Sequence, residues 1–318
     1  MNKISIPSKG SQIEITSITL GTGGFLYSDK QDYYHSLLDH YLAIGGNCID
    51  TARHYGASEN VIGSWLNKRG CRDDVVLLTK GGHPADKTPS TSRLTPRDLQ
   101  QDLDESLMAL GTSYVDLYAL HRDDPDIPVQ SIVEQLHQFV VDGKVKSVGV
   151  SNWTLERIVE ANDYAATHGL TMLSFNSPGF SLARPIEARW PGCVYADPEM
   201  IGWHESTKLP LLAWSPQAGG FFSGKYSKAA TANHDLYRVY ASSDNWERLS
   251  RVEELAKHYH TSTSQVALSY VLEQKFPTVA IIGAREIEQL NRAIEAEQLS
   301  ITREDLEWLN SNNYQIEV

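Results

Sequence analysis

The chain has 318 residues, of which 41% are hydrophobic, so it is long enough to bury a large core. A formal net charge of −12 at pH 7 disfavours nucleic acid and anionic membrane surfaces as partners. With three cysteines, no CxxC pair, no apolar signal core in MNKISIPSKG and no run as long as a membrane span, we expect a cytoplasmic protein without a disulfide framework.

Short apolar runs alternate with amphipathic segments along nearly the whole chain. The runs that we expect to be strands are 15–21, 47–50, 75–80, 115–121, 147–152, 172–177, 209–216 and 279–284. The segments that we expect to be helices are 33–46, 58–70, 95–111, 128–143, 154–169, 198–206, 246–260 and 285–297. Eight strand–helix units with strands apolar on both faces indicate an α/β fold, and they favour a closed (β/α)8 TIM barrel over an open sheet.

The two ends of the chain add smaller elements to this pattern. A Lys-Gly-Ser turn within 5–16 predicts a short N-terminal hairpin, and 301–310 predicts a C-terminal helix. Helix boundaries are also marked: Ser58 and Thr95 are expected as N-caps, and Gly111 as a helix end. Because no Pro/Gly/Ser-rich linker divides the chain, residues 1–318 are expected to form a single domain.

Four chemically compatible residues stand at or just after the ends of three successive strands. Asp50 and Tyr55 follow the second strand, Lys80 ends the third and His121 ends the fourth. The carboxyl ends of barrel strands share one rim, so these side chains should meet there. An ammonium beside a phenol favours the phenolate, so Lys80 is expected to lower the pKa of Tyr55 and to be kept charged by Asp50. His121 can hydrogen-bond a substrate oxygen or relay a proton.

Each of these residues has a structural interpretation when it is taken alone, as a cap, a solvated strand end or a core histidine. A zinc site built from Asp50, His54, His83 and His121 is a second alternative, but no HxH pair or HExxH motif supports it, and we expect no metal. A nucleophilic serine is unsupported because no GxSxG elbow occurs. The joint arrangement on successive strand ends therefore favours proton donation to a carbonyl oxygen.

Several motifs, in order along the chain, resemble those of the aldo-keto reductase superfamily. They are IDTARHYGASENVIG at 49–63, LLTKGG at 77–82, VDLYALHRDD at 115–124, KVKSVGVSNW at 144–153, LLAWSPQAGGFFSGKY at 211–226 and AIIGAREIEQL at 280–290. The resemblance implies a (β/α)8 barrel that binds NADPH in an extended form. It also implies reduction of aldehyde or ketone carbonyls by hydride transfer, with Tyr55 as the proton donor.

The resemblance also implies a set of contacts to NADP(H). Ser151 and Asn152 correspond to the pair that binds the nicotinamide carboxamide, and Trp214 to the aromatic residue that stacks on the ring. The pyrophosphate loop and the adenosine segment correspond to Ser215, Gln217, Gly219, Gly220, Ser223, Lys225, Gly283, Arg285 and Gln289, and we add Gly23 of the GTGGF turn. Arg285 is the expected partner of a 2′-phosphate, which favours NADPH over NADH.

Two positions depart from the family pattern. Ser177 stands where a glutamine usually contacts the carboxamide, and Ala293 stands where an asparagine is usual. The substrate mouth is expected to include Phe25, Tyr27, His83, Trp153 and aromatics of the 179–195 and 226–240 loops, which suggests a moderately apolar carbonyl compound.

Two other function classes stay open at this stage. The superfamily includes regulatory subunits that sense NADPH, such as the β subunits of potassium channels, and these can keep the four catalytic residues. A lyase or hydrolase that shares only the barrel is the third possibility. The sequence leaves the natural substrate undetermined, and the chain can act as a monomer or a homo-oligomer.

Overall fold

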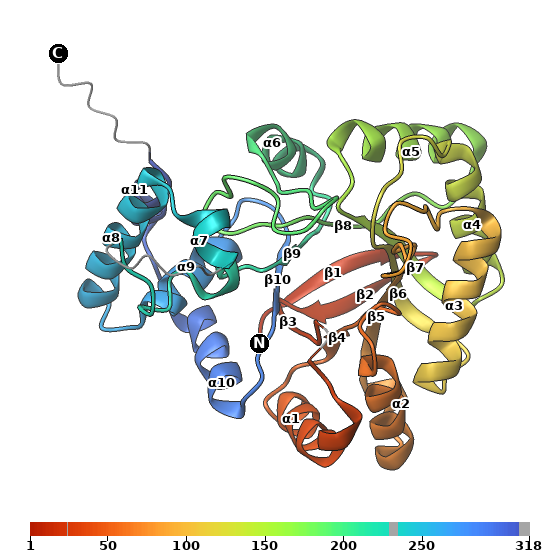
Figure 1. The fold of residues 1–318 in the computed structure, drawn as a ribbon, viewed down its shortest axis with the longest axis horizontal. Coiled ribbons are helices and arrows are strands. Elements are labelled where there is room, and N and C mark those ends of the chain that lie inside the picture. Colours follow the sequence, from red (N-terminus) through yellow and green to blue (C-terminus); the bar gives the residue numbers. More distant parts are fainter. Residues whose placement is uncertain (24, 229–234, 312–318) are drawn as a thin grey trace.

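The computed structural model describes residues 1–23, 25–228 and 235–311, and eight parallel strands close into a barrel at its centre (Figure 1). Gly24 of the GTGGF turn and residues 229–234 of the expected mouth lie outside the described residues. The strands follow one another around the barrel in the order β10-β3-β4-β5-β6-β7-β8-β9, which confirms the predicted (β/α)8 fold. Their bounds are β3 (Ile18–Gly21), β4 (Cys48–Asp50), β5 (Val76–Gly81), β6 (Val115–Leu120), β7 (Val145–Ser151), β8 (Asn176–Ser177), β9 (Leu211–Trp214) and β10 (Thr278–Ile282).

Helices surround the barrel on its outer side (Figure 1). They are α1 (Gln31–Ala43), α2 (Ser58–Arg69), α3 (Pro96–Leu110), α4 (Val129–Val141), α5 (Leu155–His168), α6 (Pro198–Thr207), α7 (Asp235–Tyr240), α8 (Ser243–His258), α9 (Thr263–Leu272), α10 (Ile287–Glu295) and α11 (Arg303–Asn310). Each expected helix, including the C-terminal one, is therefore present. Within the described ranges, no helix has the length and apolar character needed to cross a membrane.

A two-stranded hairpin precedes the barrel, as predicted. Strand β1 (Lys3–Ser8) pairs antiparallel with β2 (Ser11–Thr16), and Gly10 in the turn has φ +74°, a conformation that favours glycine. The expected strand at 15–21 is wrong at its start, because its first two residues belong to β2 and the barrel strand begins at Ile18. The sequence ITSITLG contains no turn signal before its final glycine, so it gives no sign of the change in direction between the two strands.

The molecule has two apolar cores. One lies between the barrel and its helices. The other fills the barrel interior, where Ile6 and Ile15 of the hairpin pack against inward-facing side chains of Cys48, Leu78, Leu117, Ala119, Phe175, Leu212, Val279 and Ile281. The hairpin thus closes one end of the barrel and leaves the other end for a site.

The helix boundaries confirm some predicted caps and correct one. The Thr95 side chain accepts from the Asp98 amide, Pro96 opens α3, and Gly111 ends it in the left-handed conformation. Ser58 does not cap α2: the N-cap is Ala57, and the buried Ser58 Oγ has no hydrogen-bond partner. The sequence analysis did not predict α9, although Ser262 forms a capping box at its start.

Candidate active site

The strand period of two explains why the four predicted catalytic residues meet. Cys48 and Leu78 belong to the core inside the barrel, so Asp50 and Lys80, two positions further along β4 and β5, face the same interior nearer the carboxyl rim. His121 follows Ala119 of β6 by the same step. The three side chains are almost fully buried, at 3%, 3% and 6% exposure, which places charged groups where solvent screens them little.

Lys80 is the centre of this group. Its ammonium forms an ion pair with Asp50 and donates to the carbonyl of Thr51 at 3.0 Å. The same nitrogen lies 5.2 Å from the centroid of the Tyr55 ring. The Tyr55 ring in turn meets the His121 ring edge to face, with centroids 5.4 Å apart and planes at 80°. The structure therefore brings all four residues together.

Burial and charge compete in setting the pKa values here. Burial raises the pKa of Tyr55, although the Lys80 charge acts to lower it. Lys80 therefore acts in the expected direction, but desolvation of the phenolate is the larger effect in the protein alone. Burial acts to lower the pKa of Lys80, but Asp50 and Tyr55 outweigh it and raise that pKa, which keeps the ammonium charged.

Three histidines adjoin Tyr55. His54 and His83 stack with ring centroids 3.6 Å apart, and the His83 ring lies 4.9 Å from that of His121. Burial lowers the pKa of His83 to about 4 and that of His121 well below its usual value, with the nearby Lys80 and Arg122 charges acting in the same direction on His121. His121 is therefore neutral at physiological pH. Across the described residues, no three His, Cys, Asp or Glu side chains are placed to hold a metal ion.

A cavity of about 1660 Å³ opens at the carboxyl end of the barrel, larger than the ~300–1,000 Å³ typical of a small-molecule site. It is lined by the four residues above and by every predicted cofactor residue except Ser177. The lining also includes residues that the sequence analysis did not single out: Arg122, Arg189, Trp190, Cys193, Ser262, Thr263, Ser264, Gln265, Glu286 and Arg292. Arg122 directly follows His121, so its place on the rim was readable from the strand register.

The residues expected at the carboxamide are largely engaged within the protein. Ser177 is fully buried, donates to the carbonyl of Leu212 at 2.8 Å and does not line the cavity, so this geometry lends no support to its predicted cofactor contact. Ser151 donates to the carbonyl of Ser177 at 2.7 Å. Asn152 donates to the carbonyl of His121 and to Ser151 Oγ, and its Oδ1 accepts from the Val194 amide at 3.1 Å. One acceptor position on Ser151 Oγ and one on Asn152 Oδ1 remain for a ligand there.

The loop after β9 forms a series of tight turns in the wall of the cavity. Ser215, Ala218, Gly219 and Gly220 all have φ between +50° and +95°, and the Ala218 and Gly220 amides donate to the carbonyls of Ser215 and Gln217 at 2.8 and 2.9 Å. Ser223 Oγ is buried without a hydrogen-bond partner. A buried hydroxyl of this kind needs a partner, and a phosphate oxygen would supply one. The loop therefore fits the pyrophosphate of a dinucleotide.

The far end of the cavity is charged and exposed. Gln289 Oε1 accepts from the Arg285 amide at 2.9 Å, which ties the loop after β10 to α10. The Arg285 guanidinium lies over the Phe25 ring, 5.6 Å from its centroid. Glu286 and Arg292 also line this end, and Arg292 is paired with Glu288. Of these, Arg285 is the cation that can receive a phosphate.

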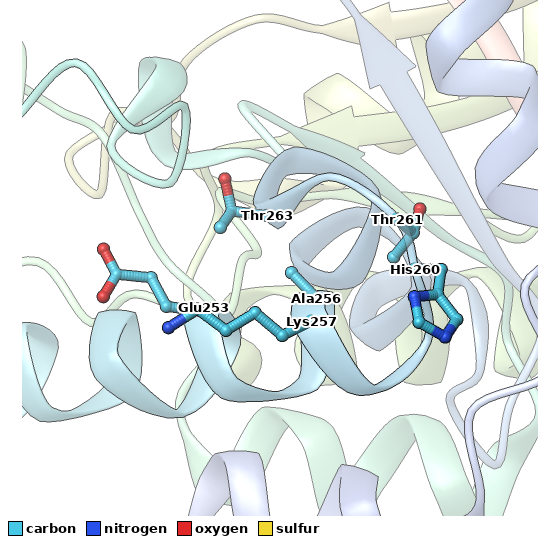
Figure 2. A pocket seen from close by; sticks show the side chains of 6 residues that line it. All are labelled: Glu253, Ala256, Lys257, His260, Thr261 and Thr263. Carbon is cyan, nitrogen blue, oxygen red and sulfur yellow. The ribbon is translucent and has the colours of Figure 1, made fainter.

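A second, shallower pocket of about 460 Å³ lies at the end of α8 and the turn into α9 (Figure 2). Six residues line it: Glu253, Ala256, Lys257, His260, Thr261 and Thr263. Apart from Thr263, none of them lines the large cavity, and the pocket contains none of the predicted catalytic residues. The predicted catalytic residues therefore all lie at the cavity in the barrel mouth.

Comparisons with known proteins agree with this geometry. The model of the aldo/keto reductase family matches residues 17–313. A putative aryl-alcohol dehydrogenase, AAD14 of Saccharomyces cerevisiae, is 27% identical over an alignment covering 98% of this chain and 86% of that protein. The aldo-keto reductase ausK of Aspergillus calidoustus is 30% identical, with 97% of this chain and 81% of its own length covered.

A solved structure shows the same fold. The thermostable aldo-keto reductase Tm1743, determined in complex with the inhibitor epalrestat, superposes with a TM-score of 0.75 over 98% of this chain and 99% of that one. The two sequences are 22% identical, so this likeness concerns the fold.

Proposed function

Because the chain belongs to the aldo-keto reductase family, whose members are oxidoreductases acting on small carbonyl compounds, we propose that it reduces an aldehyde or ketone to an alcohol with NADPH. When bound, NADPH supplies the hydride. The observation that carries the proposal is the placing of Tyr55, Lys80 and His121 together in the wall of a cavity of about 1660 Å³.

Tyr55 is the proposed proton donor. Its raised pKa means that the phenol holds its proton at neutral pH and is available as an acid. The Lys80 ammonium, held in place by Asp50, stabilises the phenolate that remains after the proton has left. His121 is neutral and can donate one ring N–H to the carbonyl oxygen, which would orient the substrate toward Tyr55.

The preference for NADPH rests on Arg285 at the far end of the cavity. Its guanidinium presents a planar fork that suits the oxygens of a 2′-phosphate. The run of left-handed residues after β9 and the Ser223 hydroxyl support a place for the pyrophosphate between Arg285 and Tyr55. Asn152 and Trp214 remain proposed contacts of the nicotinamide.

Two wider assignments belong to the same proposal. Strand β10, the last barrel strand in the chain, pairs with β3, the first, which supports the assignment of residues 1–318 to one domain. Cys48, Cys71 and Cys193 are free thiols, which suits a reducing cytoplasm.

The test is NADPH oxidation by the purified protein with a panel of aromatic and aliphatic aldehydes and ketones, beside Tyr55→Phe. We expect the variant to lose at least about a hundredfold in kcat, because the acid is lost, while its affinity for NADPH changes little. NADH measured in parallel should give the higher KM. Tight NADPH binding without turnover on any substrate would point instead to a sensing subunit, and full activity of Tyr55→Phe would remove its role as the acid.

A further inference from the structure

Arg122 is a partly buried cation at the substrate end of the cavity. Its NH1 group donates to the carbonyl of His121 at 2.9 Å and its NH2 group contacts the Cys193 thiol at 3.8 Å. Within the described residues no carboxylate lies within ion-pair distance of the guanidinium. The neighbouring Asp123 is committed to Arg157, whose Nε lies 3.0 Å from its carboxylate. A partly desolvated guanidinium therefore stands without a counter-charge, which is costly unless a ligand provides one.

The other arginines of the cavity give a useful comparison. Arg189 is paired with Asp235 at 2.9 Å and Arg292 with Glu288 at 2.9 Å. Among the described residues, Arg285 and Arg122 are the cavity arginines without a carboxylate partner, and Arg285 stands where the cofactor phosphate is proposed. Arg122 lies at the opposite end of the cavity, where an anionic group of another bound molecule can pair with it.

The Arg122 side chain is positioned near its base and at its tip. Gly192, with φ +71°, lies so close that an added Cβ would stand 3.2 Å from Arg122 Cδ, and NH1 of the guanidinium donates to the carbonyl of His121 at 2.9 Å. The Arg122 backbone is held separately, because Trp153 Nε1 donates to its carbonyl at 3.2 Å. A guanidinium held in this way loses little freedom when it binds a planar, two-oxygen acceptor.

The groups around Arg122 belong to the reacting end of the cavity. Burial is the main cause of the lowered pKa values of His54, His83 and His121, and the Arg122 charge acts on all three in the same direction. These histidines are neutral near pH 7, so they do not replace its charge. Three aspartates also line this side of the cavity. Asp50 is paired with Lys80 and Asp123 with Arg157, whereas Asp86 is highly exposed and lies 3.5 Å from His54.

Exposed aromatic surface also lines the cavity, and Trp190 stands two residues before Gly192, which lies against Arg122. Trp190 and Tyr27 both line the cavity while they expose 48% and 55% of their surface. Exposed aromatic rings at a cavity mouth are suited to the flat apolar part of a ligand.

We propose that Arg122 binds a carboxylate carried by the carbonyl substrate, so that the protein prefers aromatic or similarly apolar aldehydes and ketones with a second, acidic group. This inference rests on the proposed reductase function and names its substrate class. The substrate carboxylate would accept hydrogen bonds from the free N–H groups of the Arg122 guanidinium, while the substrate carbonyl oxygen lies next to the Tyr55 hydroxyl.

Pairs of substrates that differ only in charge test the assignment. We would measure kcat/KM with saturating NADPH for 3- and 4-formylbenzoate against 3- and 4-formylbenzamide. The wild-type protein should prefer at least one acid over its amide by about tenfold or more, as expected for charge-assisted hydrogen bonds. In Arg122→Gln this acid-to-amide ratio should fall by about tenfold. A wild-type protein that prefers neither acid would overturn the proposal.

Arg189→Gln is the matched control, since it removes the same charge from the same cavity at a residue already paired with Asp235. Its acid-to-amide ratio should stay near the wild-type value, and an equal fall in both variants would contradict a specific role of Arg122. Calorimetric titration of the NADP+-saturated protein with the same four compounds separates the two proposals. If no aldehyde is turned over, the reductase function fails. The inference about Arg122 is then decided by binding: the wild-type protein should bind the acid more tightly than the amide, and Arg122→Gln should lose this difference.

Discussion

The His83 ring is held in one orientation at the cavity mouth, where Nδ1 lies 2.7 Å from the carbonyl of Pro84 and the ring stacks on His54. Because burial lowers its pKa to about 4, the folded protein resists a proton that the unfolded chain accepts near pH 6.5. Above pH 6.5 the His83 ring is neutral in both the folded and the unfolded state. Between pH 6.5 and about 4 it is protonated only in the unfolded state, so the free energy of unfolding falls as the pH falls.

The prediction is that His83→Gln reduces the acid sensitivity of folding. Urea unfolding at pH 7.5, 6.0 and 5.0 should give the wild-type protein a steady loss of unfolding free energy. The loss should be smaller in His83→Gln, and it should not vanish, because His54 and His121 also have lowered pKa values. Equal losses in both proteins would show that His83 takes up its proton in the folded state as easily as in the unfolded chain.

At the scale of single residues, position along a strand could be predicted from the sequence, but hydrogen-bond partners could not. Asp50, Lys80 and His121 were found because residue type and strand end were both visible. The hydrogen bond of Ser177 could not be predicted, because its partner, the carbonyl of Leu212, lies 35 residues away on another strand. The unpaired state of Arg122 was equally hidden, since it depends on Arg157 having taken Asp123.

At the scale of elements, one buried carboxylate on α3 joins the two loops that carry the proposed catalytic groups. Asp102 is fully buried, accepts from the Gly82 amide at 2.8 Å just after β5, and forms an ion pair with Arg53 at 3.1 Å. Arg53 lies between Asp50 and Tyr55. Asp102 also pairs with Arg93 in the loop that leads to α3. This helix thus positions Tyr55 relative to Lys80 through charge as well as packing.

We predict that Asp102→Asn lowers the free energy of unfolding by about 2–3 kcal/mol, somewhat less than for a fully buried pair because both arginines keep some contact with solvent. It should also lower kcat, because the Tyr55 loop is less firmly held. Urea denaturation and steady-state rates provide the measurements. Asp104→Asn on the same helix is the control: its pair with Lys144 is exposed, so the change should stay below about 1 kcal/mol.

The elements themselves were predicted where periodicity was long and caps were explicit, as for α3 with Thr95 and Gly111. α9 was missed although Ser262 and Gln265 form a capping box, because seven of its ten residues are buried and its apolar pattern is not one-sided. The predicted N-cap at Ser58 was wrong for a different reason. A serine before a helical pattern suggests a cap, but here the chain enters α2 one residue earlier and buries that side chain.

At the scale of the whole molecule, the floor of the catalytic cavity depends on the hairpin that precedes the barrel. Ile6 and Ile15 fill the interior beneath the inward-facing layer that includes Leu78 and Ala119. The hairpin is also tied to the barrel wall, because Ser147 of β7 donates to the carbonyl of Pro7 at 2.8 Å. These contacts join residues far apart in the sequence, so only the hairpin, and not its place within the barrel, could be predicted.

Removing part of this plug should cost stability without changing the chemistry. We predict that Ile6→Ala lowers the unfolding free energy by about 2–4 kcal/mol, since the side chain is fully buried and the closed barrel can collapse little around the space left. Ile186→Ala, at a side chain that is 58% exposed, is the matched control and should change stability by less than about 0.5 kcal/mol. Urea unfolding at 25 °C measures both variants, and kcat of folded Ile6→Ala should remain within about twofold of wild type, because Tyr55 and Lys80 are held from the other side by β5 and α3. Similar small losses in the two variants would mean that the hairpin only covers the barrel end and does not pack within it.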